Sequence, residues 1–385
     1  MRFVHTADWH LGKRLLGHPL IDDQAYALDQ IERLCVEEKA DALVIAGDVF
    51  DRSVPPVEAV TLLDDFFERM VRRARIPVVA IAGNHDSPER LGFGRSLLEG
   101  AGVHMRTTFG DRMVPIEVPG VGGVLEFVTL PYLEPEVVRA ATGDAEVTTH
   151  DAALRRALAD VPPRADPDRF RVLVAHAFCV GGIESPDSER PLMVGGAGYV
   201  HPSAFKGFDY VALGHLHRPQ RVAGRDHIRY AGSLLKYAIE EHNHPKGVAV
   251  VEIVAGPKAP LVTTREVTLA PKRDLVRLEG TFDELSSGER FTEHEGDYVA
   301  VTYTDATYVL QAAERLRGRF PYLLEAMPKR VRRVQDDETP GEDRPDQPRE
   351  LLEAFWSYLG IDHDLEEAHR VAFERAWLMA KKEDA

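Results

Sequence analysis

Acidic, amide and imidazole side chains recur in this sequence at the ends of short apolar runs. Five segments show this pattern: DWH (8–10), GDVFD (47–51), GNHD (83–86), a lone histidine at 176 and GHLH (214–217). Carboxylate, imidazole and amide oxygen together suit divalent transition metals such as Mn, Fe or Zn. A structural zinc site is disfavoured, because the chain has only two cysteines and no cysteine cluster. The pattern therefore predicts a catalytic metal centre.

Seven or so ligands could come from these segments, which hold Asp8, His10, Asp48, Asp51, Asn84, His85, Asp86, His176, His215 and His217. That number is enough for two metals that share one bridging carboxylate. Two ions about 3.5–4 Å apart can bind a phosphate, activate a water and steady an in-line displacement. The alternative for each segment alone is ordinary turn chemistry, since Gly, Asn and Asp all favour turns, together with a surface histidine at His10 and a structural one at His176. Their joint occurrence favours the metal centre.

The apolar runs that precede these residues predict buried strands. They cover 2–7, 41–48, 77–84, 171–176, 210–215 and 247–254, and each is bounded by Gly, Pro, Asn, Asp or His. Between the early runs, 57–74 has apolar residues at three- and four-residue spacing, which predicts a helix. This alternation indicates an α/β domain, with hairpin-like β structure around 112–130 and 219–255. In such folds, ligands gather outside the carboxyl ends of the strands.

The pattern changes beyond the first 270 residues. Residues 271–334 predict a small, separate α+β unit with a helix in 307–321, and 335–349 is a charged, Pro-rich stretch typical of a flexible linker. Residues 350–385 predict two amphipathic helices with more large apolar side chains than a detached pair can bury. A tethered module that docks on a partner protein is one interpretation. The other is that the pair folds back on its own domain.

Composition sets the broad class of the protein. The 385 residues, 44% hydrophobic and 29% charged, are those of an ordinary soluble protein, and no apolar run approaches a membrane span. Cys35 and Cys179 lie in apolar segments and are expected to be core residues, which fits a reducing, cytoplasmic compartment. The formal charge of −16 argues against broad passive binding of nucleic acid, but not against an enzyme that holds phosphates through metal ions.

The order of the five motifs resembles that of the calcineurin-like metallophosphoesterases. The surrounding segments HTADWHLGKRL, AGDVFDRSVPP, LGHLHRPQ, RYAGSLLKY and RDLVRLEGTFDEL resemble one branch, the SbcD nuclease subunits of bacterial SbcCD DNA-repair complexes. The likeness covers roughly 1–335 and is most specific over 1–240. It implies a metallophosphoesterase β-sandwich flanked by helices in 1–270, with 271–334 as a capping domain.

The resemblance also implies roles for the candidate ligands. One metal would be held by Asp8, His10 and His217, the other by Asn84, His176 and His215, with Asp48 between them. In such nucleases the working ions are usually two Mn²⁺. His85 would be the catalytic residue, stabilising the transition state or protonating the leaving oxygen.

Two further carboxylates accompany these residues. Asp86 is expected to orient His85, although a plain turn carboxylate is nearly as good an interpretation. Asp51 is expected to contact the metal ligands and hold them in position without binding a metal itself. That it caps a helix or a turn is an equally good interpretation.

The resemblance implies a metal-dependent DNA nuclease, acting as double-strand exonuclease and single-strand or hairpin endonuclease in repair and recombination. Its implied partners are DNA, an SbcC-type ATPase bound by the C-terminal helices, and a second copy of the chain. For the homodimer, 89–100 is the favoured surface, whereas 57–74 is expected to pack on the sheet. Candidate phosphate contacts beside the motifs are Lys13, Arg14, Arg52, Arg90 and Arg218.

Two rival functions stay open at this point. One is a phosphoesterase of the same fold that acts on phosphoproteins or cyclic nucleotides. The other is a non-catalytic protein that binds or tethers DNA ends.

Overall fold

The structure is a computed structural model, and it describes residues 1–110, 114–164, 166, 169–183, 198–257, 259–329, 352 and 367–374. The chain forms two compact units, Met1–Leu275 and Val276–Ala385. The predicted linker 335–349 lies outside the described residues, as does most of 350–385, of which 367–374 is helical. Within the described residues, no helix has the length and apolar character needed to cross a bilayer.

The first unit contains two six-stranded sheets. The first has the order β16-β15-β1-β4-β5-β6, and β1, β4, β5 and β6 run parallel while β15 and β16 are antiparallel neighbours at one edge. Its strands are β1 Arg2–Thr6, β4 Ala42–Ile45, β5 Val78–Ile81, β6 Val103–Arg106, β15 Gly247–Val254 and β16 Leu261–Thr268.

The second sheet has the order β13-β14-β12-β9-β8-β7. Its four inner strands are parallel, and the outer strands β7 and β13 form antiparallel hairpins with β8 and β14. Its strands are β7 Ile116–Gly120, β8 Gly123–Leu130, β9 Arg169–His176, β12 Tyr210–Gly214, β13 Gln220–Val222 and β14 Arg225–Tyr230. Both regions of predicted hairpin structure are therefore confirmed.

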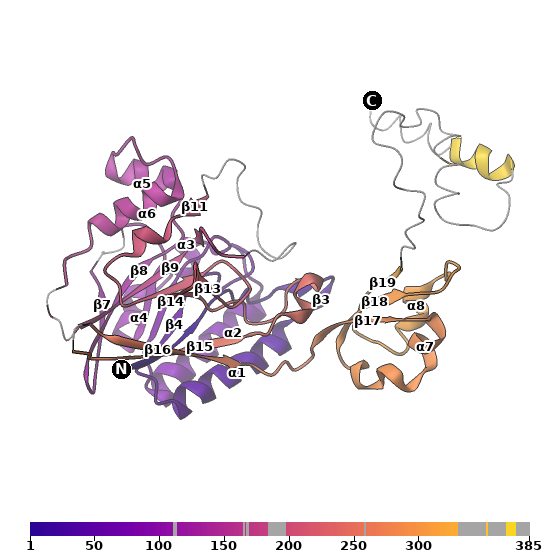
Figure 1. Ribbon diagram of the computed structural model, residues 1–385, viewed down its shortest axis with the longest axis horizontal. Helices are drawn as coiled ribbons and strands as arrows, with labels where there is room; N and C mark the ends of the chain where they lie inside the picture. Colours follow the sequence, from indigo (N-terminus) through magenta and orange to yellow (C-terminus); the bar gives the residue numbers. More distant parts are fainter. Residues whose placement is uncertain are drawn as a thin grey trace. The chain divides into compact units, whose positions relative to one another are not determined.

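The two sheets pack face to face with helices on their outer faces. Phe3 of β1 lies between them, where its ring meets Phe127 and Tyr210 of the second sheet edge to face. Figure 1 shows α1 (Ile21–Glu37) and α2 (Val57–Glu68) on one side of this unit, and α5 (Pro135–Thr142) and α6 (His150–Ala159) on the opposite side. The predicted β-sandwich flanked by helices is confirmed.

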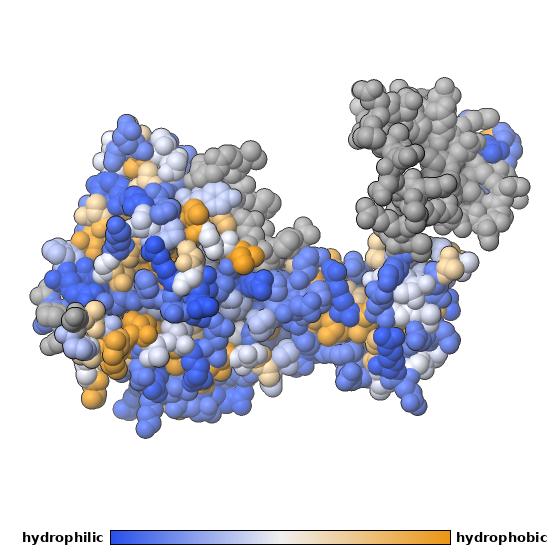
Figure 2. Space-filling view, viewed as in Figure 1, coloured by the Kyte–Doolittle hydropathy of each residue, from blue (hydrophilic) through white to orange (hydrophobic). Residues whose placement is uncertain are grey.

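Short elements occupy the connections between these layers. They are β2 Arg14–Leu15, β3 His18–Pro19, α3 Pro88–Leu91, α4 Arg95–Ala101, β10 Phe178–Cys179, β11 Tyr199–Val200, and the 3-10 turns Pro202–Phe205 and Ile239–Asn243. In the view of Figure 2, the surface of the first unit is mostly hydrophilic, with apolar residues in scattered groups.

All six predicted buried strands are present. Every residue of β4, β5 and β12 is buried, because these strands are covered on both faces. Strands covered on both faces read as continuous apolar runs instead of alternating ones. This burial explains why their positions were visible in the sequence.

The predicted helix 57–74 changes its winding. It is an α-helix only to Glu68, and Arg69–Ala74 form a π-helical segment that ends at Arg75 in the left-handed region. Phe66 and Phe67 are buried, so the helix packs on the sheet as expected.

The second unit contains a three-stranded sheet of the order β17-β18-β19. Its elements are β17 Leu275–Gly280, α7 Phe282–Ser287, a 3-10 segment Glu289–His294, β18 Tyr298–Tyr303, α8 Ala312–Leu316 and β19 Leu323–Pro328. The helix predicted across 307–321 is wrong in length, because Gln311 adopts a left-handed backbone conformation that stops a helix from extending before Ala312.

A histidine buried between the two sheets makes stability depend on pH. Burial lowers the pKa of His5 to about 3, and its Nδ1 lies 3.1 Å from the Tyr210 hydroxyl. The folded state holds this ring neutral while the unfolded chain protonates it below pH 6.5, so stability falls as pH drops from 6.5 toward 3.

We expect His5→Gln to reduce this dependence by up to about 1.4 kcal/mol per pH unit. Urea unfolding of both proteins between about pH 7 and 4, with a chelator present, measures the difference. Equal slopes for the two proteins would contradict the assignment.

Candidate metal centre

All seven candidate ligands meet at one edge of the sandwich. They follow the carboxyl ends of β1, β4 and β5 in the first sheet, and lie at the ends of β9 and β12 in the second. The parallel direction of these strands brings their ends together, although the residues span more than 200 positions in the sequence.

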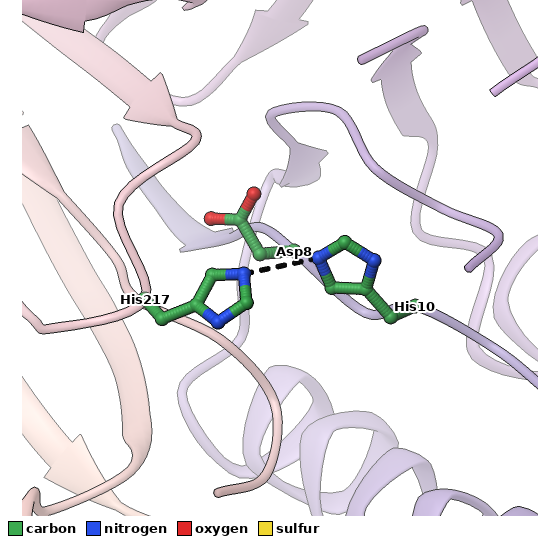
Figure 3. Close-up of side chains that lie close together, drawn as sticks. All are labelled: Asp8, His10 and His217. Carbon is green, nitrogen blue, oxygen red and sulfur yellow. Dashed lines mark hydrogen bonds between the residues drawn. The ribbon is translucent and has the colours of Figure 1, made fainter. Parts of the chain in front are cut away.

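One group of ligands joins the two sheets. Figure 3 shows the rings of His10 and His217 facing each other, with the Asp8 side chain beside them, and Nε2 of His10 lies 3.1 Å from Nε2 of His217. All three are buried, and each offers a ligand atom within 4.8 Å of the others. Two ligand atoms about 2 Å from one ion would lie at about this separation.

A second group lies around Asn84. Its Oδ1 is 2.9 Å from Nε2 of His176 and 3.1 Å from Nδ1 of His215. Asn84 comes from the end of β5, whereas the two histidines come from the second sheet.

Asp48 lies between the two groups. Its Oδ2 is 3.6 Å from Nε2 of His10 and 3.5 Å from Nε2 of His176. Its Oδ1 accepts a hydrogen bond of 2.9 Å from the backbone N–H of His85. One carboxylate oxygen is thus within reach of a histidine from each group, which is the position of a bridging ligand.

The donor chemistry of His176 fits a divalent cation. Its Nδ1–H donates to the carbonyl oxygen of Ala46 at 2.9 Å, which leaves a lone pair on Nε2 of the neutral ring. That lone pair faces two oxygen acceptors, Asn84 Oδ1 and Asp48 Oδ2. Three acceptors directed at one point make a site for a positive charge, which a divalent metal ion would supply.

Burial keeps His10 and His215 in the form that binds metals. Burial, followed by repulsion from His217 and His85, holds the pKa of His10 well below its usual value. Burial and the neighbouring His176 lower the pKa of His215 to about 3. Neutral imidazole is the form that coordinates a metal.

The backbone is strained where it delivers the ligands. Four of the nine described non-glycine residues with positive φ are candidate ligands: Asp8, His10, Asp48 and His215, with φ of 52°, 44°, 50° and 112°. Such conformations cost roughly 1–3 kcal/mol each and cluster at functional sites.

Two glycines allow the close packing behind the ligands. A Cβ at Gly83 would lie 2.2 Å from Asp48 Oδ1, and one at Gly214 would lie 1.9 Å from the carbonyl oxygen of Ala46. Because Gly83 and Gly214 have no side chain, Asp48 and Ala46, which follow β4, can approach them closely.

His85 is held by a different residue from the one predicted. Its Nδ1 lies 2.8 Å from the carbonyl oxygen of Asp51, and its ring is 4.6 Å from that of His10. The Asp86 carboxylate instead accepts three backbone hydrogen bonds, from Gly83, Val49 and Phe50. The expectation that Asp86 orients His85 is wrong, because the turn directs its carboxylate to the backbone.

The Asp51 carboxylate also lies beside the candidate ligands. Its Oδ1 accepts a 2.8 Å ion pair from Lys13 and lies 3.8 Å from Nδ1 of His10. That Nδ1 is buried and has no hydrogen-bond partner among the described residues. Asp51 is thus close enough to favour the ring orientation that turns Nε2 of His10 toward the other ligands.

Four buried supporting residues were missed from the sequence. Gln24 of α1 donates to the carbonyl oxygens of His10 (2.8 Å) and Trp9 (3.2 Å), and the Tyr237 hydroxyl also donates to Trp9. Glu241 contacts Nδ1 of His217, and Lys246 pairs with Glu241. No motif marks these residues in the sequence. Gln24, however, shares the buried face of α1 with apolar residues, and a glutamine at such a position could have indicated a supporting role.

The candidate DNA contacts lie on the surface around the site. Lys13 is half-buried against Asp51, and Arg90 donates to the carbonyl oxygen of Ser53 at 2.9 Å. Arg14, Arg52 and Arg218 are exposed.

The segment 89–100 forms most of α3, a turn and most of α4. Phe93 and Leu97 are 86% and 85% exposed, but Leu91 is 5% exposed and belongs to the core, and Leu98 packs against it. The segment 89–100 was expected to form a dimer surface, and of its apolar residues Leu91, Phe93, Leu97 and Leu98 only Phe93 and Leu97 are fully available.

Comparison with known families agrees with this geometry. Residues 1–219 match the model of the calcineurin-like phosphoesterase family, and 271–358 match a model described as the type 5 capsule protein repressor C-terminal domain. The first match spans more than half of the chain, and the fold and site described above define the same class: the chain is a calcineurin-like phosphoesterase.

A curated relative narrows this assignment. The chain is 35% identical over 324 residues to the SbcD component of the SbcCD nuclease of Staphylococcus epidermidis, covering 84% of both chains. At this identity and coverage, the chain belongs to the SbcD family. A solved archaeal phosphodiesterase structure matches 70% of this chain and all of its own, at 10% identity and a TM-score of 0.31.

Proposed function

We propose that this protein is a metal-dependent DNA nuclease that hydrolyses phosphodiester bonds as the nuclease component of an SbcC–SbcD complex. The observation that carries the proposal is the convergence of the seven candidate ligands from both sheets, with Asp48 between the two groups. The likeness to an SbcCD nuclease component supports DNA as the substrate.

Two groups of residues would each hold one metal ion. The first ion would be held by Asp8, His10 and His217. The second would be held by Asn84, His176 and His215, and Asp48 would contact both ions. Two divalent ions supply Lewis acidity toward the phosphate and lower the pKa of a water nucleophile. Mn²⁺ is the proposed ion, since imidazole with carboxylate and amide oxygen suits metals of its class.

His85 has the position of a group that acts on the substrate. Its side chain is half-exposed next to the buried ring of His10, and the Asp51 carbonyl accepts from Nδ1–H. That bond turns Nε2 away from Asp51. His85 is proposed to stabilise the charge on the phosphate or to donate a proton to the departing sugar oxygen.

The acidic chain is proposed to contact DNA through a few local cations. Arg14, Arg52, Arg90 and Arg218 are exposed around the site, and Lys13 lies beside Asp51. Because the formal charge is −16, most of the affinity for DNA is expected to come from the ATPase partner.

Cleavage of labelled DNA tests the proposal directly. The purified chain is incubated with a hairpin and with a linear duplex, in Mn²⁺ or in chelator, with and without an SbcC-type ATPase. The proposal predicts cleavage that requires Mn²⁺ and increases with the ATPase. Turnover of a small phosphodiester without cleavage of any DNA would support the metal site but contradict DNA as the substrate.

The partner proposals concern two surfaces. The predicted docking helices of 350–385 lie mostly outside the described residues, so their contact with the ATPase stays a proposal. The homodimer is proposed to involve Phe93 and Leu97, whose exposed side chains lie in a turn and the adjoining helix α4 just after the GNHD motif.

We expect the double substitution Phe93→Ser, Leu97→Ser to shift the chain from dimer to monomer, because it removes two large apolar side chains from the shared surface. Sedimentation equilibrium measures the change. Val121→Ser, at a fully exposed valine in the β7–β8 turn, is the matched control and should leave the dimer intact. An unchanged dimer in the double variant would contradict this surface.

A further inference from the structure

A buried ion pair lies directly behind one of the proposed ligands. Glu241 is fully buried in a 3-10 turn (Ile239–Asn243), and Lys246 is 7% exposed just before β15. Lys246 Nζ forms an ion pair with Oε2 of Glu241. Removing two charges from water costs several kcal/mol per ion before their attraction is counted, so such a pair is weak evidence for a purely stabilising role.

Both members of the pair contact His217. Oε1 of Glu241 lies 3.2 Å from Nδ1 of the ring, and Lys246 Nζ donates to the carbonyl oxygen of the same residue at 2.8 Å. A further N–H of Lys246 reaches Oγ of Ser233, also at 2.8 Å. The ammonium group therefore holds the main chain of His217 while the carboxylate holds its ring.

This contact decides which ring nitrogen is available to a metal. A carboxylate only accepts, so Nδ1 must carry the hydrogen and Nε2 must carry the lone pair in the neutral ring. Nε2 is the nitrogen that faces His10 and Asp8 in Figure 3. A carboxylate behind a metal-binding histidine fixes its tautomer and raises its basicity, and loss of such a partner typically lowers metal affinity about 10–100-fold.

We propose that Glu241 and Lys246 are positioning residues that fix the ring tautomer and main chain of His217 for the ion it shares with Asp8 and His10. The inference rests on the proposed function of this site and adds two residues to it. The two proposed sites should respond differently, because His176 is backed by the neutral carbonyl of Ala46 and not by this pair.

Metal titration separates the two sites. Mn²⁺ binding is measured calorimetrically and by electron paramagnetic resonance on the full chain, for wild type and Glu241→Gln. We expect wild type to bind two ions, and Glu241→Gln to bind one with unchanged affinity and the other about 10–100-fold more weakly, with loss of spin coupling at two equivalents. Glu240→Gln is the matched control at the preceding position and should titrate as wild type does.

The design separates the possible failures. Wild type that binds no Mn²⁺ would overturn the proposed function itself. Wild type that binds two ions, together with a Glu241→Gln protein that binds both equally well, would overturn only this inference.

If Glu241→Gln fails to fold, a second variant and a measurement on wild type still test the proposal. Glu241→Gln leaves the Lys246 charge buried without its partner, so Glu241→Gln, Lys246→Met is the charge-balanced alternative and should show the same selective loss. In wild type, the ring ¹⁵N spectrum of metal-free protein should show His217 with its hydrogen on Nδ1. A hydrogen on Nε2 would overturn the proposal.

Discussion

Asp48→Asn should abolish the binding of both metal ions at micromolar Mn²⁺. The substitution keeps the shape of the side chain but removes the negative charge of the oxygen that lies 3.6 Å from His10 and 3.5 Å from His176. Loss of an outer partner costs about 10–100-fold in metal affinity, so loss of a shared direct ligand should cost at least about 100-fold. DNA cleavage should fall to the level seen with chelator.

Thermal unfolding gives a readout that does not depend on activity. Mn²⁺ at about 100 times its dissociation constant should stabilise wild type by about 2.7 kcal/mol per site, and this gain should vanish in Asp48→Asn. Asp64→Asn, at an exposed carboxylate on α2, is the control and should keep the gain. A variant at Asp48 that still binds two ions would show that this carboxylate does not bridge them.

His85→Ala should lower DNA cleavage by about 10²–10⁴-fold while both metals remain bound, since loss of a positioned acid or base typically costs this much. Metal binding should survive because His85 contacts Asp48 through its backbone N–H, which alanine retains. Rates under single-turnover conditions, together with Mn²⁺ titration of the same preparations, measure the two effects separately.

The matched control is His201→Ala, at an exposed histidine in the loop before the 3-10 turn Pro202–Phe205. It should cleave DNA at the wild-type rate. Full activity in His85→Ala would remove this residue from the reaction and would leave open the rival interpretation of a protein that only tethers DNA ends. Loss of the metals in His85→Ala would instead make it a ligand.

The arrangement of the strands and their ligands was predictable because both follow from local sequence. Strands such as β4 and β5 are buried on both faces, so they are continuous apolar runs, and each is followed by Ala-Gly and then a polar candidate ligand. Parallel order then places those ends at one edge. The grouping into two sites rested on the family resemblance, and the distances around Asp48 and Asn84 are compatible with it.

The supporting residues could not be found in the same way. The contact between Glu241 and His217 joins residues 24 positions apart, and nothing periodic marks either Glu241 or Lys246. Adjacency in sequence was misleading for Asp86, because the turn directs its carboxylate to three backbone N–H groups and leaves the Asp51 carbonyl to hold His85. Such contacts depend on how the backbone turns, which residue type alone does not specify.

The most direct test of the two-metal site is an anomalous-scattering map from crystals grown with Mn²⁺. Two peaks about 3.5–4 Å apart are expected. One should lie beside Asp8, His10 and His217, the other beside Asn84, His176 and His215, and the Asp48 carboxylate should contact both. A single peak, or two peaks without Asp48 between them, would contradict the two-metal site.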